Sequence, residues 1–307
     1  MSHANPTKKQ HFVPRFYLKN FASPEGDLQV LNVKENRMAK PRPYQGLGYE
    51  YFYYALTTGK PDEIAQQVEE WFKPMEDFIS NKLPKIIEKI ETNQQIQDDD
   101  KYILSVLMSM LWLRTPGMRA QMKAMDEDMA KQIKRLHGGE GSGDRFRSKS
   151  NMGHLICMVK SLGFGNAGFA NMFFAMKWTA FLACGNEQFI TTDSPVVEKW
   201  LPPKGFYGAG FMQRDKYFAL TPKILLHLTH PVGSKKLKRK TLYEAQDDEA
   251  KMLNVILISN TQSYAYSGRK KELEALLNDR NRPGKLTLEY IEKYEKPWAE
   301  WRAKMGK

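Results

Sequence analysis

The sequence contains only two cysteines, Cys157 and Cys184, among 307 residues. Two cysteines are too few for the disulfide framework of a small secreted protein. No run of about eighteen apolar residues is present, so we expect no membrane-spanning helix. Residues 1–9 lack the apolar core of a signal peptide, which predicts a cytoplasmic location. Together with a globular composition of 41% hydrophobic residues, these absences exclude a secreted scaffold, a collagen and a membrane protein.

Common motifs of cofactor and metal chemistry are missing as well. Neither Gly-x-Ser-x-Gly nor His-Glu-x-x-His occurs, and the glycines at 138–143 lack the Gly-Lys-Ser/Thr ending of a P-loop. Residues 163–168 match Gly-x-Gly-x-x-Gly, but helical spacing before them predicts that Gly163 ends a helix. We therefore expect no nicotinamide or flavin. His227 and His230 would point to opposite faces of a strand and have no cysteine partners, so no zinc finger is expected.

Basic residues are in excess. The chain has 47 Lys and Arg against 35 Asp and Glu, a formal net charge of +12. The densest basic run consists of Lys235, Lys236, Lys238, Arg239 and Lys240. Such a run is commonly a solvated loop that keeps a protein soluble. Its functional interpretation is a surface that binds the phosphates of nucleic acid, with no membrane partner implied.

Hydrophobic periodicity predicts an α+β class: a helix-rich core with short, mostly antiparallel strands in one elaborated domain. Strands are expected at 28–33, 50–54, 188–192, 217–220, 224–228 and 264–267, and helices within 62–136 and at 155–162, 169–184 and 243–259. Pro74 and Pro84 should kink the first helical stretch or break it into two or three helices. Met118, Met122, Met125 and Met129 share one helical stripe, which indicates either core packing or a partner groove.

The domain boundaries follow from composition. We expect a flexible N-terminus at 1–9, a single domain at 10–279 with a mobile glycine-rich loop at 137–153, and a basic C-terminal helix at 280–307.

Several polar residues lie where apolar ones are expected. His11 stands among aromatic residues, as either a structural imidazole or a site imidazole. Glu69 and Glu76 are seven residues apart, which would place them on one helix face, either exposed or holding a cation. Arg114 directly follows a very apolar helix and is a candidate for binding a carboxylate or phosphate, and Arg119 could join it.

Asp193 ends an apolar segment and begins a turn. Its carboxylate could cap that turn, or serve as a base, a metal ligand or a partner of Arg114.

The sequence also contains a series of characteristic blocks. They are Gln-His-Phe-Val-Pro-Arg-Phe-Tyr-Leu-Lys-Asn-Phe at 10–21, Tyr-Phe-Tyr at 51–53, Glu69 with Glu76, Leu-Arg-Thr-Pro at 113–116 with Arg119, Trp178, Phe-Ile-Thr-Thr-Asp-Ser-Pro-Val at 189–196, Leu-Thr-Pro at 220–222, and Leu-Asn at 253–254 leading to Ser267. In order and spacing, over residues 10–268, these blocks resemble a bacterial family known as domain of unknown function 4238. Ser194 departs from the asparagine expected after the aspartate.

No activity can be transferred from that family. The resemblance implies that its recurring blocks contain His11, Glu69, Glu76, Arg114, Asp193 and Asn254. We expect these residues to converge in one pocket of a single domain.

We therefore predict a bacterial metal-dependent hydrolase, a nuclease acting on phosphodiesters. Glu69, Glu76 and Asp193 would hold Mg²⁺ or Mn²⁺, His11 would act as general acid or base, and Arg114 would bind a phosphate. The alternative is a non-enzymatic nucleic-acid-binding or phage-defence factor whose polar cluster is structural. A toxin-like protein acting on a small metabolite is a third interpretation. The sequence predicts no oligomeric state.

Overall fold

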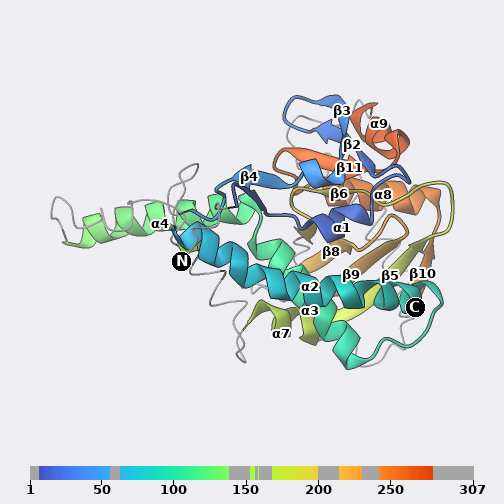
Figure 1. Ribbon diagram of the computed structural model, residues 1–307, viewed down its shortest axis with the longest axis horizontal. Helices are drawn as coiled ribbons and strands as arrows, with labels where there is room; N and C mark the ends of the chain where they lie inside the picture. Colours follow the sequence, from blue (N-terminus) through green and yellow to red (C-terminus); the bar gives the residue numbers. More distant parts are fainter. Residues whose placement is uncertain are drawn as a thin grey trace, which may run out of the picture.

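The computed structural model describes residues 7–55, 63–137, 153–155, 158, 168–199, 214–229 and 242–278. These residues form a single α+β domain in which helices pack against three small sheets (Figure 1). The predicted fold class is confirmed. No helix in the described ranges is long and apolar enough to cross a membrane.

A two-stranded ribbon opens the domain. Strand β1 (Lys9–His11) pairs antiparallel with β4 (Tyr49–Tyr51), so that His11 lies opposite Tyr49. The strand predicted at 50–54 is shorter than expected, because its last residues form a turn. Helix α1 (Arg15–Lys19) follows β1 directly and begins after Pro14, whose fixed φ suits that position.

Gly48 allows the two ends of this ribbon to approach. Its φ is +66°, and a Cβ there would lie 2.9 Å from the Cβ of Val13. The Gly48 carbonyl accepts hydrogen bonds from the backbone N–H groups of Phe12 and Val13. A side chain at position 48 would therefore displace the segment that carries His11.

A four-stranded antiparallel sheet joins distant parts of the chain in the order β3-β2-β11-β6. Its strands are β2 (Asp27–Asn32), β3 (Arg37–Pro43), β6 (Thr191–Thr192) and β11 (Tyr264–Ser267), and a short 3₁₀ helix η1 (Tyr44–Gly46) follows β3. Helix α9 (Lys270–Asn278) packs on β11 and β2. The strands predicted at 28–33 and 264–267 are confirmed, because their hydrophobic alternation is local.

The second sheet has five strands in the order β10-β5-β9-β8-β7. They are β5 (Lys177–Ala183), β7 (Val196–Lys199), β8 (Asp215–Ala219), β9 (Ile224–Thr229) and β10 (Leu242–Ala245), and only the β10–β5 pair is parallel.

Two predicted helices were too long because each included one of these strands. Helix α7 (Phe169–Ala175) ends before β5, where aromatic and β-branched residues pair along the full length of β9. Strand β10 likewise precedes helix α8 (Asp247–Ile258), which starts at a capping box formed by Gln246 and Glu249.

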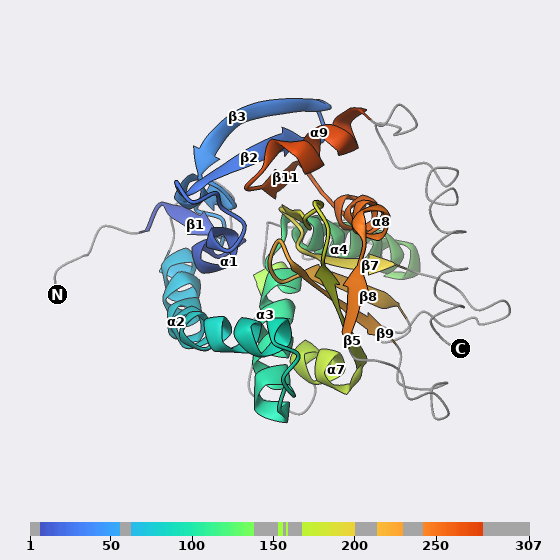
Figure 2. The same cartoon turned by 90° about the vertical axis from the view of Figure 1, so that its right-hand side faces the viewer.

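Three long helices follow one another in the sequence: α2 (Glu63–Glu91), α3 (Asp98–Leu113) and α4 (Pro116–His137). Helix α2 contains both Pro74 and Pro84, and Figure 2 shows its axis bending along its length. The prolines therefore bend this helix without breaking it. Helix α3 is mostly buried from Leu104 to its end at Leu113, where its sequence is almost continuously apolar.

The methionine stripe of α4 is only partly in the core. Met118 is buried, whereas Met125 and Met129 are 54% and 48% exposed. The core-packing prediction is therefore wrong for the last two residues. Several predicted features lie outside the described residues: the loop residues 138–152, residues 163–167 of the Gly-x-Gly-x-x-Gly segment, most of the helix predicted at 155–162, and the C-terminal segment 280–307.

Candidate functional site

Arg114 is a buried charge at the end of α3, with 1% of its surface exposed. Its Nη1 donates to Glu76 Oε1, its Nη2 to the carbonyl of His11, and its Nε to the Tyr54 hydroxyl at 2.5 Å. The guanidinium also lies over the ring of Phe72, 4.1 Å from the ring centre. Arg114 therefore connects α2, α3 and the N-terminal ribbon and fixes the backbone of His11.

A cavity of about 530 Å³ lies between α2 and the N-terminal segment. We call it the His11 pocket, and its charged or titratable lining includes Lys9, His11, Arg15, Glu69, Lys73 and Glu76. Glu69 and Glu76 do share one face of α2, as their spacing predicts.

Glu69 has an unusual environment in this pocket. Its Oε2 is buried and has no hydrogen-bond partner among the described residues. Burial raises the pKa of this carboxyl to about 7, although the positive charge of Arg114 opposes the shift. Nearby Glu76 adds to the increase, since two carboxylates repel each other. Glu69 is therefore a carboxyl that exchanges its proton near neutral pH.

The pKa of His11 is lowered, whereas that of Glu69 is raised. Burial, together with the charge of Arg15, lowers its pKa to about 4, so the ring is neutral at physiological pH. Its Nε2 lies 3.2 Å from Arg15 Nε and 3.4 Å from the carbonyl oxygen of Gln45. One tautomer accepts from Arg15 and the other donates to Gln45, so these two contacts are alternatives.

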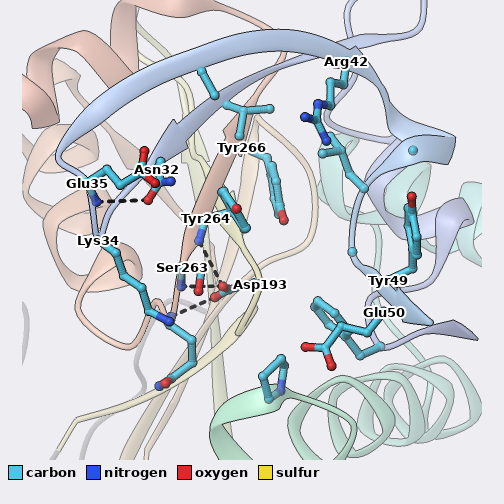
Figure 3. A pocket seen from close by; sticks show the side chains of 18 of the residues that line it. Asn32, Lys34, Glu35, Arg42, Tyr49, Glu50, Asp193, Ser263, Tyr264 and Tyr266 are labelled. Carbon is cyan, nitrogen blue, oxygen red and sulfur yellow. Dashed lines mark hydrogen bonds between the residues drawn. The ribbon is translucent and has the colours of Figure 1, made fainter. Parts of the chain in front are cut away.

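A second cavity, of about 750 Å³, lies between the four-stranded sheet, β4 and the start of α4. We call it the Asp193 pocket (Figure 3). The Asp193 carboxylate accepts backbone hydrogen bonds from Gln262 at 2.9 Å, Ser263 at 2.6 Å and Tyr264 at 2.9 Å. Burial nevertheless raises its pKa to about 6. Asp193 thus connects the end of β6 to the turn that precedes β11.

The family model described as protein of unknown function (DUF4238) matches residues 9–271. The chain belongs to this DUF4238 family. The comparisons with curated proteins and with solved structures found no match to this chain.

Four of the six residues implied by the resemblance come together in this DUF4238 chain. His11, Glu69 and Glu76 line the His11 pocket. Arg114 donates hydrogen bonds to the backbone carbonyl of His11 and to the Glu76 carboxylate. The predicted phosphate-binding role of Arg114 is not supported. Its guanidinium is buried behind the pocket and lines neither of the two cavities described above.

The predicted metal set of Glu69, Glu76 and Asp193 is not assembled. Asp193 lines the other cavity, and Glu76 is paired with Arg114. Within the described ranges, no group of three or more His, Cys, Asp or Glu side chains could hold a metal ion.

Asn254 and Arg119 lie elsewhere in this DUF4238 chain. On α8, Asn254 accepts from the backbone N–H of Ile190 at 3.0 Å and donates to the carbonyl of Gln188 at 2.7 Å, which anchors the segment before β6. Arg119 lines the Asp193 pocket, where its Nη2 donates to Glu50 at 2.7 Å.

The basic run predicted to bind nucleic acid lies outside the described residues; it consists of Lys235, Lys236, Lys238, Arg239 and Lys240.

Sequence reasoning missed Arg15 as a pocket residue. Arg15 follows His11 by four positions and begins α1 after Pro14. This short spacing within the first block was the available signal, because Pro14 sets the direction in which the helix starts.

The contacts of Asp193 predict a loss of stability upon its substitution. Asp193→Ala leaves three backbone N–H groups without their acceptor and should cost about 2 kcal/mol of unfolding free energy. Asp193→Asn keeps one acceptor oxygen and should recover part of this loss. Urea denaturation of both variants measures the difference. An alanine variant as stable as the wild type would contradict the anchoring role.

Proposed function

We propose that this chain is a hydrolase of phosphodiesters and that its chemistry takes place in the His11 pocket. The observation that carries the proposal is the Glu69 carboxyl, whose pKa is about 7 and whose buried Oε2 lacks a partner among the described residues. It shares the cavity with a neutral imidazole. Two titratable groups whose pKa values are pushed apart are typical of an acid and base pair.

The roles follow from the two protonation states. Neutral His11 accepts a proton from the attacking water as the new phosphorus–oxygen bond forms. Protonated Glu69 gives its proton to the leaving oxygen as the old phosphorus–oxygen bond breaks. The products are a phosphomonoester and an alcohol, and the proton on His11 returns through solvent to Glu69.

The cations of the pocket suit an anionic substrate. Arg114 neutralises Glu76, and Glu69 is uncharged in its acid form. The remaining carboxylates of the lining, Glu70 and Asp77, then face Lys9, Arg15 and Lys73. Arg15 is the cation closest to the imidazole and would bind a phosphoryl oxygen.

The test is cleavage of short single-stranded RNA and DNA, with EDTA and with added Mg²⁺ or Mn²⁺. We expect activity between about pH 4 and pH 7, since the base must be neutral and the acid protonated. Glu69→Gln should lower kcat by about 100-fold or more. Glu88→Gln, an exposed glutamate on the same helix, is the matched control and should retain full activity.

Absence of turnover under every condition would overturn the proposal, as would a Glu69→Gln chain that keeps the wild-type rate. Turnover that needs Mg²⁺ or Mn²⁺ would contradict the metal-free proton transfers proposed here and would favour a metal-dependent hydrolase instead.

A further inference from the structure

The Asp193 pocket has the size and lining of a ligand site, and the proposed function does not use it. Its volume of about 750 Å³ lies within the range of roughly 300–1,000 Å³ that small-molecule sites occupy. In Figure 3, Arg42, Tyr49 and Glu50 stand on one side of the cavity, and Lys34, Asp193 and Tyr264 on the other.

Four cations line this cavity: Lys34, Arg37, Arg42 and Arg119. Arg37 pairs with Glu35 in an exposed ion pair, and Arg119 pairs with Glu50. Neither Lys34 nor Arg42 forms an ion pair with any residue in the described part of the chain. The positive charge of Lys34 acts on the Asp193 carboxyl and lowers its pKa, so Lys34 is partly offset, whereas no carboxylate among the described residues pairs with Arg42.

Arg119 contributes a further unsatisfied group. Its Nη1 is buried and, within the described residues, has no hydrogen-bond partner. The guanidinium lies 4.1 Å from the ring centre of Tyr53, which holds it in place. A buried donor without an acceptor destabilises the protein, and an oxygen of a bound ligand would supply the missing acceptor.

Aromatic rings supply the apolar part of the cavity. Tyr49, Tyr51, Tyr264 and Tyr266 all line it. Tyr51 is 54% and Tyr264 40% exposed, so both rings are open to solvent, whereas Tyr266 is buried. Exposed rings beside cations form the kind of surface on which nucleic-acid bases stack while phosphates bind nearby.

We propose that the Asp193 pocket binds a nucleotide. The base stacks on Tyr264 or Tyr51 at the mouth of the cavity. The phosphate is bound by Arg42 and Lys34, and the unpaired N–H of Arg119 donates to a ligand oxygen. This chemistry is shared by a free mononucleotide and by one nucleotide of a single strand. The proposal is independent of the reaction proposed for the His11 pocket.

The experiment is calorimetric titration of the full chain with AMP, GMP, CMP, UMP, inorganic phosphate and a single-stranded RNA of eight nucleotides. The RNA titration uses the Glu69→Gln chain so that cleavage cannot interfere. We expect a nucleotide to bind at least about tenfold more tightly than phosphate, because its base stacks on an aromatic ring and phosphate has no group that can stack. Tight binding of mononucleotides identifies a free nucleotide as the ligand, and tight binding of RNA alone identifies a strand.

Two variants and one control locate the site. Arg42→Gln should weaken binding by about tenfold, which corresponds to the loss of one charged hydrogen bond. Tyr264→Leu should weaken the binding of nucleotides but not that of phosphate. Arg135→Gln replaces an exposed arginine of α4, about 24 Å along the helix from Arg119, and should leave affinity unchanged.

Three results would overturn the proposal: no saturable binding of any nucleotide or RNA, equal affinity for phosphate and nucleotides, or variants that bind as tightly as the Arg135→Gln control.

Discussion

Arg114→Met is expected to cost about 3–5 kcal/mol of unfolding free energy, the amount typical of removing one partner from a buried charged network. The substitution preserves much of the side-chain volume, so the loss comes from polar groups. Glu76 loses its cation, and the His11 carbonyl and the Tyr54 hydroxyl lose a donor. Urea denaturation, followed by circular dichroism, should show a lower midpoint with an unchanged slope.

Two further variants separate the network from a general effect of losing an arginine. Arg135→Met removes an exposed arginine and should change stability by no more than about 0.5 kcal/mol. Glu76→Gln should cost less than Arg114→Met, because Glu76 is 25% exposed. Combining Glu76→Gln with Arg114→Met should cost less than the sum of the two changes. Additive costs would contradict a direct pair, and a loss below about 1 kcal/mol for Arg114→Met would contradict the network.

The first block of the sequence was informative because its chemistry is local. His11, Pro14 and Arg15 lie within one strand and one helical turn, so a short stretch of sequence places them together. The seven-residue spacing of Glu69 and Glu76 likewise predicted a shared helix face. Arg114 was identified because it ends an almost wholly apolar helix, where a charge must find partners inside the protein.

Asp193 and Asn254 were harder to interpret for a physical reason. Their partners are mainly backbone groups: the N–H groups of 262–264 for Asp193, and groups of Ile190 and Gln188 for Asn254. Backbone partners carry no side-chain signature, so one sequence cannot distinguish such an anchor from a catalytic carboxylate or a ligand-binding amide. The β5 error has a similar origin, since pairing with β9 decides the strand and that pairing is nonlocal.

Glu69→Gln is expected to stabilise the protein above neutral pH while it removes the proposed activity. The carboxyl has a folded-state pKa of about 7 against an ordinary value of 4.5. Because the folded state binds this proton more tightly than the unfolded state, stability falls as pH rises from about 4.5 to 7. The ionised carboxylate then costs about 3 kcal/mol above pH 7. Glutamine cannot ionise, so the variant escapes that cost.

The measurement is the unfolding free energy of wild type and Glu69→Gln between pH 4 and pH 8. Their difference should be small near pH 4, grow through the window from 4.5 to 7 and level off above it. Glu88→Gln, whose carboxyl is exposed, should show no such pH-dependent gain. A gain in stability combined with a loss of activity is expected of a functional carboxyl, since natural proteins retain such groups at a cost to the fold. A difference that is flat with pH would mean that Glu69 ionises as it does in water, and the proposed reaction would then lack its proton donor.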